Sequence, residues 1–231
     1  MEQGKTFMEG LQAAIPTSLG YISIGLACGI IAAPYMNPFE MLLMSLLVYA
    51  GSAQFAMLAM FAVQAPLIDI TLTVFLINLR LGLLSLHAST IFREESIWQN
   101  VGIGSLLTDE TYGVLMGERL HQDYISPAWM NGNNLNSYIA WALGTVIGTT
   151  LGSLLPNPEA FGLDFALLGM FVGIFASQFY AMLHRIKLQK ILLILAVVGA
   201  SFLLLTMIVS DSLAVLIATL IGCTVGVMVN D

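Results

Sequence analysis

Charged residues are scarce in this sequence. Only 9% of its 231 residues are Asp, Glu, Lys or Arg, and 58% are hydrophobic, whereas soluble domains carry about 25% charged residues. This composition excludes a soluble globular protein. One spanning helix with its connection takes roughly 25 to 30 residues, so the length allows about seven or eight spans and no second folded domain. We predict an all-α polytopic protein of the lipid bilayer, with a single transmembrane domain over residues 1–231.

Basic residues and cysteines are also few. Seven Lys and Arg stand against 14 Asp and Glu, a formal net charge of -7, and no basic cluster is present to neutralise phosphates, so nucleic acid is not an expected partner. Cys28 and Cys223 lie in apolar stretches without Cys/His spacing, which predicts neither a metal site nor a disulfide framework. Neither a Gly-x-Ser-x-Gly element nor a His-Glu-x-x-His helix occurs. We therefore expect no enzyme and no cofactor.

Runs without charge mark the expected membrane spans, because a charge at the centre of a spanning helix costs about 2.5 to 3.5 kcal/mol. Two further segments carry charges: 66–89 contains Arg80, and 101–117 contains Asp109 and Glu110. If 101–117 crosses the membrane, the chain has eight spans, and if this segment is re-entrant, it has seven. The charge-free runs are 11–33, 41–62, 134–155, 165–183, 191–210 and 212–230.

An internal repeat is indicated at an offset of 124 residues, the spacing from Gly20 to Gly144. Matches of Gly, Pro and Gln at one register are less common by chance in apolar sequence than matches of Leu or Ile. The predicted halves are 1–125 and 126–231, and a site at the interface of two halves recurs in transporters. A fourth segment that crosses fully makes the repeat parallel, and a re-entrant one makes it inverted. The other informative pairs are Pro34 with Pro158, Gln54 with Gln178, and Phe55 with Phe179.

The distribution of Lys and Arg bears on orientation, because these residues are enriched in cytoplasmic loops. The connection from His184 to Lys190, and the C-terminus one helical hairpin later, are expected in the cytoplasm in both the seven-span and the eight-span topology. The side of the N-terminus differs between the two topologies and stays open.

Arg80 lies deep in an apolar segment, too far from either end to reach the interface easily. An arginine does not lose its charge, so inside a membrane it needs an anion, a group of carbonyls or water as partner. Two interpretations stay open. Arg80 either forms a permanent ion pair that locks two helices, or it binds a substrate carboxylate or partners a titrating acid.

Asp109 and Glu110 are adjacent in the middle of 101–117. Neighbouring residues on a helix point about 100° apart, so the two carboxylates are not expected to face one pocket equally. An acid near Arg80 within the membrane can bind and release a proton during transport, which makes both residues candidates for proton coupling. The alternative is a re-entrant or interfacial helix with a hydrated acidic tip.

The segment 49–55 interrupts an apolar run with Gly51, Ser52 and Gln54. Small residues at this depth permit close helix packing. Alternatively the helix is broken here, and the backbone N–H groups at the start of its second half suit a substrate carboxylate. The candidate substrate-binding residues are Arg80, Tyr49, Gly51, Ser52, Gln54, Asn78 and Gln178.

Two motifs occur in a specific order: Tyr49-Ala50-Gly51-Ser52-Ala53-Gln54-Phe55 and Leu107-Thr108-Asp109-Glu110, with 16–22, 78–80 and 141–145 in support. On these residues the chain resembles the AzlC family, the large subunit of branched-chain amino-acid exporters, over nearly its full length. The resemblance implies export of leucine, isoleucine, valine and often methionine across the bacterial plasma (inner) membrane. It also implies a hetero-oligomer with a separate small AzlD-like membrane subunit.

The residues are compatible with such a substrate. An apolar amino acid is a zwitterion, which needs an anion site, a cation site and an apolar cavity. Arg80 or the backbone of Gly51 and Ser52 is expected to serve the carboxylate, and Asp109 or Glu110 the ammonium group. Two other functions stay open: an accessory or scaffold membrane subunit, and a passive channel for another small solute.

Overall fold

The computed structural model describes residues 5–154, 172, 175–176, 179–180, 182–183, 186–209 and 211–230. All regular elements in these ranges are helices, which confirms the all-α class. The chain divides into two compact units, Met1–Leu168 and Gly169–Asp231. The predicted single transmembrane domain, with halves 1–125 and 126–231, stays a prediction.

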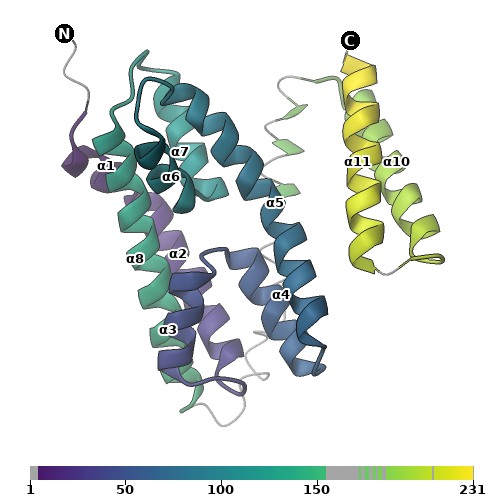
Figure 1. Ribbon diagram of the computed structural model, residues 1–231, viewed down its shortest axis with the longest axis horizontal. Coiled ribbons are helices and arrows are strands. Elements are labelled where there is room, and N and C mark those ends of the chain that lie inside the picture. Colours follow the sequence, from purple (N-terminus) through teal and green to yellow (C-terminus); the bar gives the residue numbers. More distant parts are fainter. Residues whose placement is uncertain are drawn as a thin grey trace. The chain divides into compact units, whose positions relative to one another are not determined.

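The first unit contains eight of the described helices and the second contains two (Figure 1). In the first unit they are α1 (Phe7–Ala13), α2 (Ile15–Ala32), α3 (Pro38–Leu47), α4 (Gly51–Ala62), α5 (Leu67–Ile91), α6 (Ile97–Ser105), α7 (Asp109–Arg119) and α8 (Pro127–Gly152), and in the second α10 (Leu188–Leu205) and α11 (Asp211–Asn230).

Three of the described helices, α2, α5 and α10, are long and apolar enough to cross a membrane. α3, α4 and Leu213–Val229 are shorter apolar helices. The charge-free run 41–62 is two helices, because the chain leaves helical geometry between Leu47 and Gly51. Of the two interpretations of segment 49–55, the broken helix is the one present. Segment 101–117 is likewise divided between α6 and α7.

Local capping explains where several of these helices begin. The Asn37 side chain accepts hydrogen bonds from the N–H groups of Phe39 and Glu40 at 3.0 Å each, and the Glu40 carboxylate accepts from Asn37 N at 2.8 Å. This reciprocal pair is a capping box, and Pro38 occupies a position where a missing N–H costs nothing. At the start of α8, Ser126 Oγ accepts a hydrogen bond from Trp129 N at 3.2 Å, and Pro127 follows it.

Helices α2 and α8 pack backbone against backbone. A Cβ atom added at Gly29 would lie 2.0 Å from the carbonyl oxygen of Thr145, and one added at Gly148 would lie 2.3 Å from that of Leu26. Residue numbers increase together along the contact, from Ile22 beside Gly144 to Leu26 beside Gly148. The two helices are therefore parallel. Small residues permit this approach, which is a common way to hold helices together in membranes.

The two helix breaks lie along neighbouring turns of α8. Asn134 Nδ2 donates to the carbonyl of Ile103 at 2.9 Å and Asn133 Nδ2 to that of Thr111 at 3.0 Å, so α8 holds both arms of the α6–α7 pair close to their break. The other break faces Trp141, whose ring lies 3.0 Å from a Cβ built at Gly51. In Figure 1, α3 and α4 run toward the break between them from one end of the first unit, and α6 and α7 run toward theirs from the other end.

The α2–α8 contact generates a prediction for Gly29. Gly29→Ala places a methyl group against the backbone of α8, so the helices must separate and the free energy of unfolding should fall by about 1 to 3 kcal/mol. Thermal unfolding in detergent measures this. Gly20→Ala on the same helix is the matched control, because no atom lies within 4 Å of its added Cβ. Equal unfolding midpoints for the two variants would contradict the packing described here.

Candidate functional site between two broken helices

The first break leaves the start of α4 uncapped. Val48 (φ -117°, ψ 70°) and the extended Ala50 end the regular geometry of α3, and α4 begins at Gly51. Ala50 offers no capping side chain, and the first turn of α4 contains no acidic residue. The first N–H groups of a helix have no partner within it and carry the positive end of its dipole. This end of α4 is therefore suited to an anion, as the interpretation of a broken helix requires.

The second break has the opposite character. Thr108 caps α7: its Oγ1 accepts from Thr111 N at 3.2 Å, and Thr111 Oγ1 accepts from Thr108 N at 2.9 Å. Asp109 and Glu110 occupy the first turn, where negative charge is favoured by the helix dipole. The start of α7 is therefore capped and acidic, whereas the start of α4 is neither.

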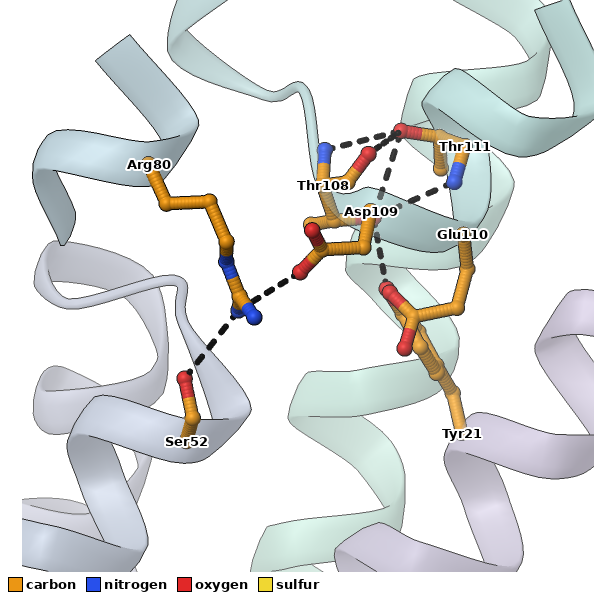
Figure 2. A network of polar contacts seen from close by, with 7 residues as sticks. All are labelled: Tyr21, Ser52, Arg80, Thr108, Asp109, Glu110 and Thr111. Carbon is orange, nitrogen blue, oxygen red and sulfur yellow. Dashed lines mark hydrogen bonds and ion pairs between the residues drawn. The ribbon is translucent and has the colours of Figure 1, made fainter. Parts of the chain in front are cut away.

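Arg80 of α5 lies between these two helix starts (Figure 2). Its Nη2 lies 2.6 Å from Asp109 Oδ2 in an ion pair and donates a longer hydrogen bond, 3.5 Å, to Ser52 Oγ of α4. The side chains of Arg80 and Asp109 are 39% and 21% exposed, so the pair is accessible to a ligand. This geometry agrees with both interpretations of Arg80. The ion pair with Asp109 fits a lock between two helices, and the position beside the uncapped start of α4 fits a ligand for a substrate carboxylate.

Glu110 has a different partner, Tyr21 of α2. The Tyr21 hydroxyl lies 2.6 Å from Glu110 Oε2 and also 2.6 Å from Thr108 Oγ1 (Figure 2). Tyr21 is only 6% exposed, and its ring packs edge-on against Trp141 with centroids 5.4 Å apart. The two adjacent carboxylates thus point to different partners, as their helical spacing predicts.

Gln54 supports the first break from inside. Its Nε2 donates to the carbonyls of Val48 at 2.7 Å and Met44 at 3.4 Å, and its Oε1 accepts from Trp141 Nε1 at 3.1 Å. The side chain is fully buried. Because both ends of the amide are bound to protein groups, the described contacts make Gln54 a residue that holds the break open. Its predicted contact with substrate stays a prediction.

The other predicted site residues are less closely joined. The Tyr49 ring packs edge-on against Tyr138, with centroids 4.8 Å apart, and its hydroxyl is buried without a hydrogen-bond partner in the described part of the chain. The Oδ1 atom of Asn78 in α5 is likewise buried without a hydrogen-bond partner among the described residues. Gln178 lies outside the described residues, as does His184. Among the residues that the structure describes, no group of three His, Cys, Asp or Glu is placed to hold a metal.

Sequence reasoning missed Tyr21 and Trp141 as site residues. Both lie in segments that carry the family resemblance, 16–22 and 141–145, so a signal was present. A tyrosine or tryptophan on an apolar helix does not reveal where its hydroxyl or indole N–H points, however. Only the packing of α2 and α8 against the breaks decides this.

Comparison with known proteins identifies the family. The model of the family described as AzlC protein matches residues 16–155, which is more than half of the chain and contains all the contacts described above. The chain belongs to the AzlC family. Within this family it is 31% identical to the inner membrane protein YgaZ of Escherichia coli (strain K12) over 207 residues, 84% of this chain and 80% of that protein.

Other AzlC-type relatives are also membrane proteins. An uncharacterized membrane protein of Helicobacter pylori (strain J99) is 26% identical over 176 residues, 76% of each chain. One from Archaeoglobus fulgidus is 29% identical over 157 residues, 67% of each chain. No solved structure matches this chain. Its membership of a family of membrane proteins is consistent with a role in membrane transport.

The contacts of Gln54 generate a second prediction. Gln54→Leu leaves the Val48 carbonyl and the Trp141 indole N–H without their partner, and each unsatisfied buried group costs about 1 to 3 kcal/mol. The thermal unfolding midpoint in detergent should fall clearly, whereas Gln12→Leu at an exposed position of α1 should leave it near that of the wild type. A Gln54→Leu protein as stable as the wild type that no longer binds substrate would instead make Gln54 a direct substrate ligand.

Proposed function

We propose that this protein is the large subunit of an exporter of leucine, isoleucine, valine and methionine, working in the bacterial plasma membrane. The proposal includes proton coupling and a small AzlD-like membrane subunit as partner. One observation carries it. Arg80 bridges the uncapped start of α4 and the acidic start of α7, which brings an anion site and a cation site side by side.

The two helix starts match the two charged groups of an amino acid. The carboxylate would accept hydrogen bonds from the backbone N–H groups of Gly51 and Ser52 and from Arg80, since all of these groups donate. The ammonium group would lie beside the carboxylates of Asp109 and Glu110. The aromatic rings of Tyr21, Tyr49 and Trp141 form an apolar cluster nearby. The choice of branched-chain side chains rests on the family resemblance.

We also propose a parallel repeat of two four-segment halves, in which α3–α4 and α6–α7 each count as one segment. Support comes from the parallel contact of α2 with α8, whose paired residues Ile22 and Gly144 are 122 positions apart (144 minus 22), close to the offset of 124 found for Gly20 and Gly144. In this repeat, α3–α4 and α6–α7 each turn back at the break, forming a V, and return to the side from which they started. Only α5 then crosses between α2 and α8, so α2 and α8 run in the same direction. The expected span over 165–183 falls mostly outside the described residues.

The localisation belongs to the same proposal. YgaZ is named as an inner membrane protein, which supports placing this chain in the plasma membrane of a bacterium. We place the connection from His184 to Lys190 and the C-terminus in the cytoplasm, on the basis of the positive residues in that connection.

Efflux from vesicles tests the function. Vesicles that contain this chain and its small subunit are loaded with leucine, methionine or lysine, and release is followed with time. Leucine and methionine should leave and lysine should stay. Arg80→Ala should slow leucine efflux by at least about tenfold, because a charge-assisted hydrogen bond to a carboxylate contributes about 1.5 to 3 kcal/mol.

The matched control is Arg93→Ala, which removes an exposed arginine between α5 and α6 and should leave efflux as in the wild type. Vesicles without the small subunit test the need for a partner. Absence of leucine efflux from well-folded wild-type complex would contradict the proposed substrate. Flux that does not saturate at millimolar leucine would indicate a passive channel.

A further inference from the structure

The two carboxylates at the start of α7 are bound by groups of different hydrogen-bonding chemistry. Asp109 contacts the guanidinium of Arg80, which has only donors and keeps its charge. Protonation of Asp109 would remove the ion pair and leave the charge of Arg80 uncompensated by this contact. Glu110 contacts the hydroxyl of Tyr21, which both donates and accepts. That contact is satisfied by either protonation state of Glu110.

Hydroxyl groups beyond Tyr21 allow both states without leaving a polar atom unpaired. When Glu110 is ionised, the Tyr21 hydroxyl donates a hydrogen bond to Glu110 Oε2. When Glu110 is protonated, its own O–H donates to the Tyr21 oxygen, and the Tyr21 proton turns to Thr108 Oγ1, which lies at the same 2.6 Å distance. Thr108 Oγ1 in turn lies 3.2 Å from Thr111 Oγ1, so its hydroxyl proton also has an acceptor (Figure 2).

Charge distinguishes the two acids as well. Arg80 neutralises Asp109, whereas Glu110 has no ion-pair partner among the described residues. The titratable groups that interact with Glu110 in the described part of the chain are Tyr21 of α2, Tyr49 between α3 and α4, and Asp109 on its own helix, and Arg80 of α5 lies one step away as the partner of Asp109. When Glu110 is ionised, Arg80, Asp109 and Glu110 together carry one uncompensated negative charge. Glu110 is exposed, so a cation can reach it.

We propose that Glu110 is the exchange carboxylate of this transporter, binding either a proton or the ammonium group of the substrate but not both. Asp109 stays ionised as the partner of Arg80, and Tyr21 is a positioning residue for Glu110. The inference rests on the proposed function and narrows its coupling to one residue. When the amino acid binds, the O–H bond of Glu110 breaks, the proton leaves to the solution, and the carboxylate keeps the electron pair and pairs with the ammonium group.

Mutually exclusive binding at one carboxylate has a direct consequence for transport. The site changes access in one direction with a proton bound and in the other direction with an amino acid bound. A proton gradient directed inward therefore drives the substrate outward. The expected ratio is one proton for each amino acid.

Proton release on leucine binding tests the inference. Leucine is added to the purified complex in weakly buffered detergent solution, and a pH indicator follows the protons while calorimetry follows binding. The wild type should release up to one proton for each leucine bound at low pH, and none at high pH. Glu110→Gln should bind leucine with no proton release and with an affinity that does not depend on pH.

Asp109→Asn should bind leucine more weakly, because the ammonium group loses one of its two neighbouring carboxylates, but it should still release a proton at low pH. Tyr21→Phe should keep the one-proton stoichiometry and move the pH of half-release upward, because the ionised form of Glu110 loses a donor. Glu94→Gln in the exposed connection between α5 and α6 is the matched control and should behave as the wild type.

Three results would overturn the inference: a wild type that binds leucine without releasing protons anywhere between about pH 4 and 9, proton release that persists in Glu110→Gln, or release that is lost in an Asp109→Asn protein still able to bind leucine. The first of these needs no variant, so it decides the matter even if a variant fails to fold. A folded wild type that binds neither leucine nor methionine would refute the proposed function itself, and the inference with it.

Discussion

A helix broken inside a membrane must satisfy its own backbone, because lipid offers no hydrogen bonds and each unpaired group costs several kcal/mol. This constraint accounts for five of the buried polar residues in the first unit. Gln54 takes the Val48 carbonyl at one break, and Thr108 with Thr111 closes the other. Asn133 and Asn134 bind carbonyls on both arms of α6–α7. The N–H groups at the start of α4 are the notable remainder, and the candidate site is built around them.

Helix α8 shows how this constraint shapes a sequence. With 26 residues, α8 is long enough to span a membrane, yet it is not among the three helices apolar enough to qualify. Five of its polar residues are buried: Asn133, Asn134, Ser137, Thr145 and Thr149. Asn133 and Asn134 bind carbonyls of α7 and α6, and Ser137, Thr145 and Thr149 bind carbonyls of α8 itself. The low hydropathy of α8 therefore reflects a central position in the unit.

Sequence alone indicated the elements of the site but not their partners. Gly51, Ser52 and Gln54 pointed to a break, because small and polar residues inside an apolar run suggest one, and the break is present. Arg80 and Asp109 were both selected as charges in apolar segments, yet their pairing depends on how α5 lies against α7. Hydropathy did not reveal that 41–62 is two helices, since a V-shaped pair and a continuous helix have the same composition. Tyr21 was missed because the target of a hydroxyl is a property of packing.

The glycine contact between α2 and α8 has a mechanical consequence. Where carbonyl groups touch the opposite Cα atoms, as at Gly29 and Gly148, the surfaces are too closely fitted to slide by a turn without collision. For the proposed exporter, we therefore expect the two helices to form a stationary frame while access to the site changes. Within the first unit, the arms α3–α4 and α6–α7 and the helix that carries Arg80 lack such a glycine contact with the frame, so for the proposed exporter we expect the rearrangement there.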